Sequence, residues 1–409
     1  MIRALSSWRA AVPLPFFLTA PVALLAAGSL LLAVGAVALR SGWTPVTLVL
    51  THLGTLGFLS MVLWGVVYQI VPSVAVNVRG RRAGYAAHAL LMVGLVFLAW
   101  GFLGGGRWAI LATLSSLVPA LLLFIVPMAW TLRRSSNEVG LALVVALGAL
   151  LLTAFLGLWM AHGHGGMRFP GPRPLWVQAH LCTALLGWVG ALLSAVSWHT
   201  LPATCPSRRG AYLVLGTLSV GVLLPVIVLG LEWAGIFEGG GASPQQLAAL
   251  GALPALVVVW SVQPLQSLRV LVARASAEPT GSESFWQAGF ALAPLVGLVA
   301  LVAYLSDDPR WSVLLGWLAI WGWAGMIAHG LLLAGSAGCR RAYVLHAISL
   351  VLGVIAILTG ISWLARFTGL FLVAAALNLG SSLVPLLREQ YALTTAGAGD
   401  CSSRRRRVR

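Results

Sequence analysis

The sequence predicts an all-α integral membrane protein of about twelve transmembrane helices. Of its 409 residues 60% are hydrophobic and 8% are charged, and the mean hydropathy is strongly positive. A water-soluble fold of this size has too little polar surface to cover so many apolar side chains. A glycine-aromatic mark also returns along the chain at a nearly constant interval. We therefore expect one transmembrane domain over residues 1–409, built from three four-helix arcs around a pseudo-threefold axis.

Apolar stretches long enough to cross a bilayer recur along the whole chain, since a hydrocarbon core takes about 20 helical residues. We expect spans at 13–39, 45–72, 84–104, 107–132, 139–161, 175–201, 210–236, 246–272, 284–305, 310–335, 341–361 and 366–388. Four spans fall in each of the repeats 1–135, 136–270 and 271–390. Residues 391–409 are predicted to form a basic, disordered tail.

The arginines predict the orientation of the chain. The net charge of +16 comes from 25 basic residues, all of them arginine, against nine acids. If the N-terminus is cytoplasmic, 19 arginines lie on the inner side, and six lie on the outer side, namely Arg40, Arg107, Arg168, Arg173, Arg310 and Arg366. The positive-inside rule then places both termini in the cytoplasm of a multi-pass protein of the inner (plasma) membrane. The basic tail is expected to meet anionic lipid, and nucleic acid is not an expected partner.

The repeat is carried by the stretch His52–Pro72, which has a counterpart at His180–Pro202. Gly57-Phe58 in the first matches Gly187-Trp188 in the second, and a weaker third copy begins at Gly316-Trp317. The three glycines lie 130 and 129 residues apart (57 to 187 to 316). This spacing predicts that spans two, six and ten occupy equivalent places around the axis.

His52 and His180 are the first candidates for binding a cofactor. His52 enters span two from outside and lies about two helical turns below the surface, where an unpaired imidazole is costly and functional by default. His180 enters span six from the same side, and Cys182 takes the place equivalent to His52. The alternative is that each imidazole only bonds a neighbouring carbonyl. Gly57 and Gly187 are expected to leave room for a flat ring, although small residues also serve helix packing.

A second group of candidate ligands follows span five, in the sequence His162-Gly-His164-Gly-Gly-Met167. Imidazole and thioether together suit copper, and imidazole alone also suits haem iron or zinc. We expect a short outer loop here that brings His162 and His164 to the side of His52 and His180. The alternative is that the two histidines of this glycine-rich loop are only solvated by water.

Glu232, near the outer end of span seven, is the candidate catalytic residue. A carboxylate inside an apolar run relays protons, balances a cation or holds a ligand, unless it reaches the outer interface. Toward the inner side, His329 lies well within span ten. The sequence places His88, His199 and His346 at the inner interface.

Twelve spans in three arcs, with histidines entering spans two and six from outside, resemble the catalytic subunit of the haem-copper oxidase and nitric oxide reductase superfamily. The resemblance is strongest to diverged, stand-alone members such as the NnrS-type haem and copper membrane proteins. It implies haem b with His52 as the haem ligand and His180 as a second haem ligand or as the ligand of the active-site copper. His162 and His164 stay candidate metal ligands on the chemistry of their own stretch. The resemblance also implies an electron donor or a small gaseous ligand as partner, and is compatible with a homo-oligomer.

The chain departs from that superfamily at three places. Ala184 follows the span-six histidine where oxidases have tyrosine, Glu232-Trp233 replaces the histidine pair of span seven, and the stretch 311–315 of span ten has no histidine. Oxygen reduction by the usual haem-copper centre is therefore not expected, and the resemblance leaves open whether the chain is an oxidoreductase.

Two other classes of function remain open. Twelve spans and a buried carboxylate at Glu232 also suit a secondary transporter, although common transporters divide into two halves rather than three parts. A non-catalytic membrane assembly factor that keeps the fold is the third alternative. No cleaved signal peptide is expected, and the four cysteines predict no disulfide framework, because three of them fall on the reducing side and Cys182 lies within a helix.

Overall fold

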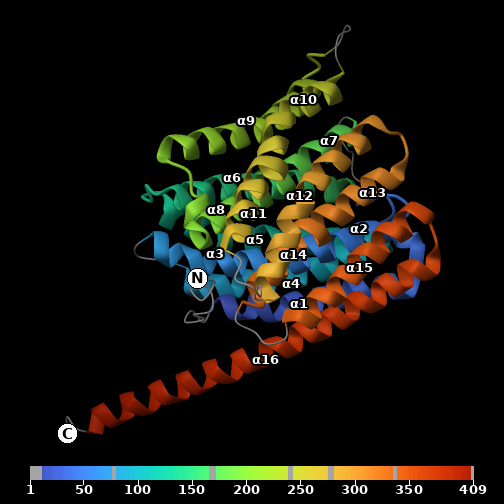
Figure 1. The fold of residues 1–409 in the computed structure, drawn as a ribbon. Coiled ribbons are helices and arrows are strands. Elements are labelled where there is room, and N and C mark those ends of the chain that lie inside the picture. Colours follow the sequence, from blue (N-terminus) through green and yellow to red (C-terminus); the bar gives the residue numbers. More distant parts are fainter. Residues whose placement is uncertain are drawn as a thin grey trace.

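The computed structural model describes residues 12–75, 80–164, 172–237, 243–274, 281–334 and 339–406. Over these residues the chain forms helices joined by short turns and no β-strand. Figure 1 shows the helices gathered in one bundle, with the last helix leaving it. Met167, one of the predicted ligands, lies outside the described residues.

The helices follow one another with few interruptions. Short π-helical and 3-10 segments, labelled η, continue or join the α-helices. In chain order the elements are α1 (Pro13–Val34), η2 (Gly35–Leu39), α2 (Pro45–His52), η3 (Leu53–Leu59), α3 (Ser60–Val74), α4 (Arg81–Trp100), η4 (Gly101–Gly105), α5 (Gly106–Leu132), α6 (Glu138–His164), α7 (Arg173–Leu181), η5 (Cys182–Gly190), α8 (Ala191–Thr200), η6 (Pro202–Thr204), α9 (Arg208–Trp233), α10 (Pro244–Val257), η7 (Val258–Val262), α11 (Gln263–Arg274), α12 (Gly281–Leu305), α13 (Pro309–Trp317), η8 (Leu318–Ala324), α14 (Gly325–Leu332), α15 (Cys339–Thr359) and α16 (Ser362–Arg406).

Eleven helices in the described part of the chain are long and apolar enough to cross a membrane. Their bounds lie within a few residues of the predicted spans. One of them, Arg82–Leu132, has 51 residues and contains both the third and the fourth predicted span. It folds back at Gly104, where φ is 105°, and its arms α4 and α5 pack side by side. Only glycine adopts such a φ without strain, so the glycine run makes this turn.

Three of the membrane-crossing helices are the most buried. They are Pro45–Val74, Arg173–Thr200 and Pro309–Leu332. The buried share of their most apolar stretch is 61%, 78% and 78%, in that order, whereas it is 33–50% in the other eight helices. These three central helices are the predicted spans two, six and ten. The first and the third of them touch directly, since Phe58 in η3 stacks on Trp321 in η8 with ring centroids 6.3 Å apart.

Each central helix begins with a proline in its first turn and carries a π-helical segment in its middle. The prolines are Pro45, Pro174 and Pro309, and the π segments are η3, η5 and η8. Pro fits the first helical turn because its missing N–H would be unpaired there anyway. Two further π segments, η4 and η7, lie on other helices.

The third copy of the repeat is displaced from the interval that the glycine-aromatic mark predicted. The initial prolines lie 129 and 135 residues apart (45 to 174 to 309). Gly57 and Gly187 lie inside η3 and η5, whereas Gly316 precedes η8. The residue of η8 that holds their place is Gly322, followed by Trp323.

The first and last helices pack along their length and close the bundle. Cβ atoms added to α1 and α16 would collide at several levels, from Gly35 against Ser362 to Gly369 against Leu32. Because the higher-numbered residues of one helix meet the lower-numbered residues of the other, α1 and α16 are antiparallel. The start of α1 and the far part of α16 therefore lie at the same end of the bundle.

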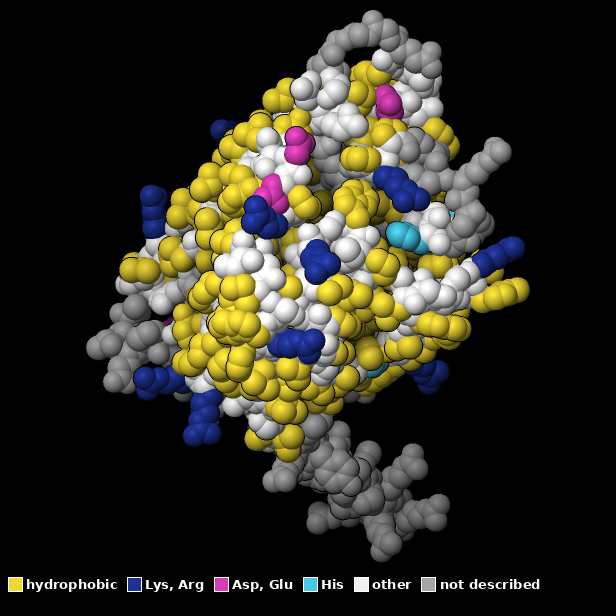
Figure 2. Space-filling view, turned by 90° about the vertical axis from the view of Figure 1, so that its right-hand side faces the viewer, with side chains coloured by type: hydrophobic (Ala, Val, Ile, Leu, Met, Phe, Trp, Pro, Cys, Tyr) yellow, Lys and Arg dark blue, Asp and Glu magenta, His cyan; other side chains and the backbone are white. Residues whose placement is uncertain are grey.

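The outer surface of the bundle is apolar. Large hydrophobic side chains are exposed on nearly every peripheral helix, among them Leu213, Leu298 and Leu377 at 73%, 58% and 60%. Figure 2 shows hydrophobic side chains covering much of one face and surrounding scattered arginine and acidic side chains. Such a surface is stable in contact with lipid, so the protein is a multi-pass membrane protein.

The last helix, α16, runs on into the residues of the predicted tail. α16 continues beyond the bundle as a helix to Arg406, and Figure 1 shows it projecting toward the C-terminus. The stretch that leaves the bundle begins with leucine, arginine, glutamate and glutamine, all of which favour helix.

Candidate functional site

His52 ends α2, directly before the π segment η3. Its Nδ1 lies 2.7 Å from the carbonyl oxygen of Leu48, one turn earlier on the same helix. A carbonyl oxygen only accepts, so Nδ1 carries the proton and donates it. The other ring nitrogen, Nε2, is left with its lone pair available for a metal or a second donor.

His180 takes the same arrangement one repeat later. It lies two residues before η5, and its Nδ1 donates to the carbonyl oxygen of Thr153 on α6 at 3.1 Å. Its ring lies against Gly157, where an added Cβ would come within 2.8 Å of the imidazole Cε1. The Nε2 of His180 is again the free nitrogen. The alternative stated for the sequence was that each imidazole only bonds a neighbouring carbonyl. That alternative accounts for Nδ1 of each ring but not for Nε2.

Three histidines and one phenylalanine lie together at this end of the bundle. The ring of His52 lies 5.2 Å from the ring of Phe102, and Phe102 lies 5.4 Å from the ring of His164. His52 lies within electrostatic range of both His164 and His180. Figure 1 places the starts of α2 and α7, which carry two of these histidines, at the same end. We call His52, Phe102, His164 and His180 the outer cluster.

His162 points away from the outer cluster. Both His162 and His164 belong to the last turn of α6, which corrects the expectation of a loop at these two residues. Two positions apart on a helix, they face opposite sides. The ring of His162 stacks on Trp159 at 6.0 Å, while His164 meets Phe102. The structure thus does not bring the two together as a chelating pair.

The outer cluster supplies two to three imidazoles rather than a full metal cage. Within the described ranges, no group of three or more His, Cys, Asp or Glu side chains is placed to hold a metal ion. Structural zinc uses four protein ligands and catalytic zinc three. A planar macrocycle brings four of its own nitrogens and needs only one or two imidazoles.

Gly57 and Gly187 serve helix packing, so the expectation that they leave room for a flat ring is wrong. A Cβ at Gly57 would lie 2.6 Å from the Cβ of Ala23 on α1. A Cβ at Gly187 would lie 2.6 Å from the Cβ of Ala149 on α6. Glycine at these points lets neighbouring backbones approach closely.

Glu232 continues the buried face of α9 to its end. Val228 and Leu229, four and three residues earlier, are buried, and Glu232 itself is half-buried. The next residue, Trp233, is 65% exposed. The carboxylate therefore belongs to the last inward-facing turn before the interface. Its catalytic role stays a prediction.

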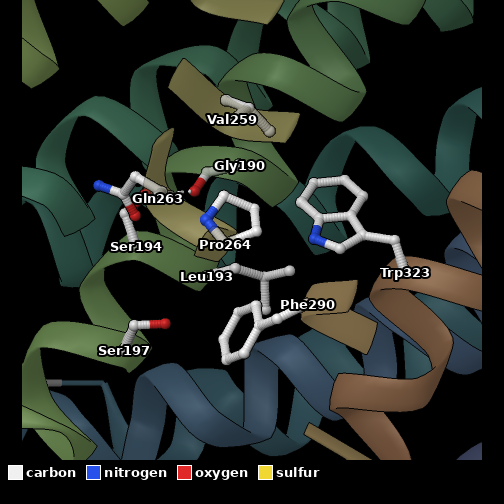
Figure 3. A pocket seen from close by; sticks show the side chains of 9 residues that line it. All are labelled: Gly190, Leu193, Ser194, Ser197, Val259, Gln263, Pro264, Phe290 and Trp323. Carbon is white, nitrogen blue, oxygen red and sulfur yellow. Dashed lines mark hydrogen bonds between the residues drawn. The ribbon is translucent and has the colours of Figure 1, made fainter. Parts of the chain in front are cut away.

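Two cavities lie elsewhere in the bundle. The first, of about 10 Å³, is close to the volume that one water molecule needs. Figure 3 shows its lining, with Gln263 beside Ser194 on one side and Trp323 and Phe290 on the other. The hydroxyl of Ser194 donates to the carbonyl of Gly190 at 2.8 Å. This is a water-sized, mostly apolar gap where two of the central helices meet η7, α11 and α12.

The second cavity, of about 310 Å³, lies where η2, α13 and α15 end or begin, next to Arg40, Asp308 and Arg310. Arg310 forms an ion pair with Asp308 at 2.6 Å. The hydrogen bonds of Arg310 lower the pKa of the Asp308 carboxyl group. The lining combines these three charged residues with buried apolar residues such as Leu39 and Ile357, and it contains no histidine.

A second pair of histidines lies deeper in the bundle. The sequence singled out His329, which is fully buried, but placed His346 at the inner interface. The structure corrects this, because His346 is 1% exposed and its ring lies 4.4 Å from that of His329. His346 is one helical turn beyond Ala342, which is also buried, so the face of α15 that follows Arg341 turns inward.

Phe102 and the π segments were not recognised in the sequence. Phe102 stands in the glycine run that turns α4 into α5, and that run was the available signal. No protein-family profile matches this chain, and no curated protein sequence matches it.

Proposed function

We propose that this chain is a haem b-binding membrane protein that acts in redox chemistry or in the handling of nitric oxide. The observation that carries the proposal is the shared posture of His52 and His180. Each imidazole donates its Nδ1 proton to a backbone carbonyl and keeps Nε2 free. Histidines that ligate metals almost always hold their other nitrogen in this way, which fixes the tautomer and the ring orientation.

The imidazoles of His52 and His180 fit a haem better than they fit a copper ion that is held by protein ligands alone. Two imidazoles with free Nε2 atoms would be enough protein ligands to hold one haem. Copper at His162 and His164 together is disfavoured, because these two rings contact different aromatic partners. His164 remains the reserve ligand or cap of the outer cluster.

Bound haem would supply an iron that changes its charge by one electron or binds a small gas. The residues of the chain have simpler tasks. Leu48 and Thr153 orient the two imidazoles through their carbonyl groups. Phe102 stands between His52 and His164 and keeps that side apolar. Glu232, at the outer end of α9, would relay a proton or balance a cation through its carboxylate.

The finer architecture belongs to the same proposal. We infer twelve spans in three arcs around a pseudo-threefold axis, with both termini in the cytoplasm. Three observations support the arcs: the central position of spans two, six and ten, their initial prolines, and their π segments. The antiparallel packing of α1 on α16 supports a common side for the termini. The excess of arginine supports the cytoplasmic side.

The test is the visible spectrum of the purified protein, oxidised and reduced. We expect a Soret band with about one haem per chain, and its loss in His52→Ala and in His180→Ala. His199→Ala is the matched control, since His199 lies on the central helix that carries His180 but outside the outer cluster. A parent protein without a Soret band, or a band unchanged in His52→Ala, would falsify the proposal.

The same measurement separates the alternatives. A transporter or an assembly factor predicts no stoichiometric cofactor. To keep misfolding from imitating the loss of a ligand, each variant is compared with the parent by its yield in the membrane and its elution as a single species.

A further inference from the structure

The second cavity, of about 310 Å³, lies at the end of the bundle where α1 and α15 end. α1 ends at Val34 and α15 at Thr359, and the chain enters the bundle again at Pro309 and Ser362, the first residues of α13 and α16. The cavity is lined by residues from these helix ends, and it contains no residue of the outer cluster.

Three arginines lie at this cavity. Arg40 and Arg310 line it. Arg366 lies beside Gly35, where an added Cβ would come within 3.3 Å of the arginine Nε. The sequence assigns only six arginines to the outer side, so half of them meet here. Basic side chains gathered at one hollow raise the local concentration of anions, which favours an anionic ligand.

Two of these arginines hold helix ends together. Nη1 of Arg310 donates to the carbonyl oxygen of Leu358 at 3.1 Å, and Nη1 of Arg366 donates to that of Leu32 at 2.8 Å. Both carbonyls belong to the last turn of a helix, α15 or α1, where they lack a partner within the helix. Arg310 is also paired with Asp308 through Nε and Nη2.

Arg40 is the arginine of this group that has no such task. Its guanidinium forms no ion pair or hydrogen bond with any residue in the described part of the chain. Two arginines and one aspartate line the cavity, and Asp308 is bound to Arg310. One positive charge is therefore left over, and it belongs to Arg40. A ligand with a single negative charge would balance it.

The inner part of the cavity is apolar. Leu39, Ala356 and Ile357 line it and are 4%, 1% and 2% exposed. Arg40 and Arg310, by contrast, are exposed at the rim. A hydrocarbon chain covers such an apolar surface favourably, whereas a small inorganic anion does not. The cavity thus suits a ligand that is anionic at one end and apolar at the other.

Exposed tryptophans mark this end of the bundle as a membrane interface. Trp43, three residues after Arg40, is 55% exposed, and Trp363, three residues before Arg366, is 59% exposed. Tryptophan side chains collect where lipid headgroups meet hydrocarbon. Since the arginines stand next to these tryptophans along the chain, the rim of the cavity lies in the headgroup layer.

We propose that this cavity binds one anionic phospholipid, with its phosphodiester group on the guanidinium of Arg40 and an acyl chain along Leu39 and Ile357. A guanidinium donates two parallel hydrogen bonds to two oxygens of a phosphate group. Phosphatidylglycerol carries the single negative charge that balances Arg40, whereas phosphatidylcholine carries no net charge. A lipid held here joins η2 to α15. The proposal depends neither on haem nor on which side of the membrane this end faces.

The test uses the full-length protein, purified in an uncharged detergent and depleted of lipid. Its unfolding temperature is measured with added phosphatidylglycerol, phosphatidylcholine or inorganic phosphate. We expect phosphatidylglycerol to raise it more than phosphatidylcholine does, and inorganic phosphate to leave it unchanged. Native mass spectrometry then counts the bound lipid. We expect one tightly held phosphatidylglycerol per chain, bound about fivefold more weakly in Arg40→Gln, the effect of one basic residue at an anionic lipid surface.

Arg107→Gln is the matched control, because Arg107 is an exposed arginine that the sequence assigns to the same side but that does not line the cavity. It should bind phosphatidylglycerol as the parent does. Arg40→Lys keeps the charge without the fork and should bind with intermediate affinity. Equal binding by Arg40→Gln and Arg107→Gln would overturn the proposal.

The comparison of ligands in the parent needs no variant, so it holds even if a substitution disturbs folding. Equal stabilisation by phosphatidylcholine would mean that the cavity recognises only hydrocarbon. Equal stabilisation by inorganic phosphate would mean a site for a free anion. Either result would overturn the assignment of an anionic phospholipid.

Discussion

Gly369 on α16 faces Gly28 on α1 so closely that a Cβ added to Gly369 would lie 2.5 Å from the carbonyl oxygen of Gly28. The backbone N of Leu32 would be equally near. Only hydrogen atoms fit between the two helices at this level. The contact that closes the bundle therefore depends on two small residues, as is common between membrane helices.

Gly369→Ala should separate α1 from α16. Because the colliding atoms are backbone, they cannot turn aside, and we expect a loss of about 1–3 kcal/mol as for other overpacked sites. Thermal unfolding in detergent measures this. Gly230→Ala, on α9 with open space at its Cβ, is the control and should leave the unfolding temperature unchanged or raise it. Equal stability of the two variants would contradict the close contact.

Gly104→Ala should destabilise the turn between α4 and α5 without any collision. A Cβ at Gly104 meets nothing within 4 Å, but φ of 105° is a conformation that alanine avoids. We expect about 1–3 kcal/mol of backbone strain. Gly216→Ala, which also has open space but an ordinary helical φ, controls for the added methyl group. The unfolding temperatures of the two variants are compared, and a turn that tolerates alanine would leave them equal.

Gly157→Ala should disturb the outer cluster through His180. The added methyl group would come within 2.8 Å of the imidazole, which must tilt away from α6 and loosen its bond to Thr153. If His180 binds haem, the Soret band shifts or weakens while the fold remains. Gly148→Ala, on the same helix with open space, should keep the parent spectrum. An unshifted band in Gly157→Ala would remove His180 from the ligand set.

The orientation of the chain can be tested by labelling with a membrane-impermeant thiol reagent. The four native cysteines are replaced by serine, and one cysteine is introduced at a time. Gly42→Cys, in the exposed turn after η2, should react in intact cells. Ser403→Cys, near the end of α16, should react only after the membrane is opened, because we place it in the cytoplasm. The reverse pattern would invert the topology.

The spans could be predicted from the sequence because hydropathy and helix length follow directly from the thickness of a bilayer. The central role of spans two, six and ten was also accessible, since their glycine-aromatic marks repeat. The third mark was placed one and a half turns too early, at Gly316 instead of Gly322. Both glycines precede a tryptophan, and only the position of η8 distinguishes them.

The π segments and the contact between His329 and His346 could not be predicted in the same way. A π-helical turn changes which carbonyl each N–H meets, and side-chain periodicity carries little trace of this. His346 was assigned to the interface because of its arginine neighbours. Whether a residue near a helix end faces lipid or protein depends on the rotation of the helix, which a nearly all-apolar sequence does not encode.

The π segment η8 also sets the angular phase of everything that follows it. Each residue of an α-helix advances the chain by about 100° around the axis, so the extra residue accommodated by a π turn decides which way α14 faces. Winding the stretch Leu318–Ala324 as a plain α-helix would leave the same residues, the same apolar character and nearly the same length. It would rotate His329 about a quarter turn away from His346. A change that hydropathy cannot detect would thus separate the two imidazoles.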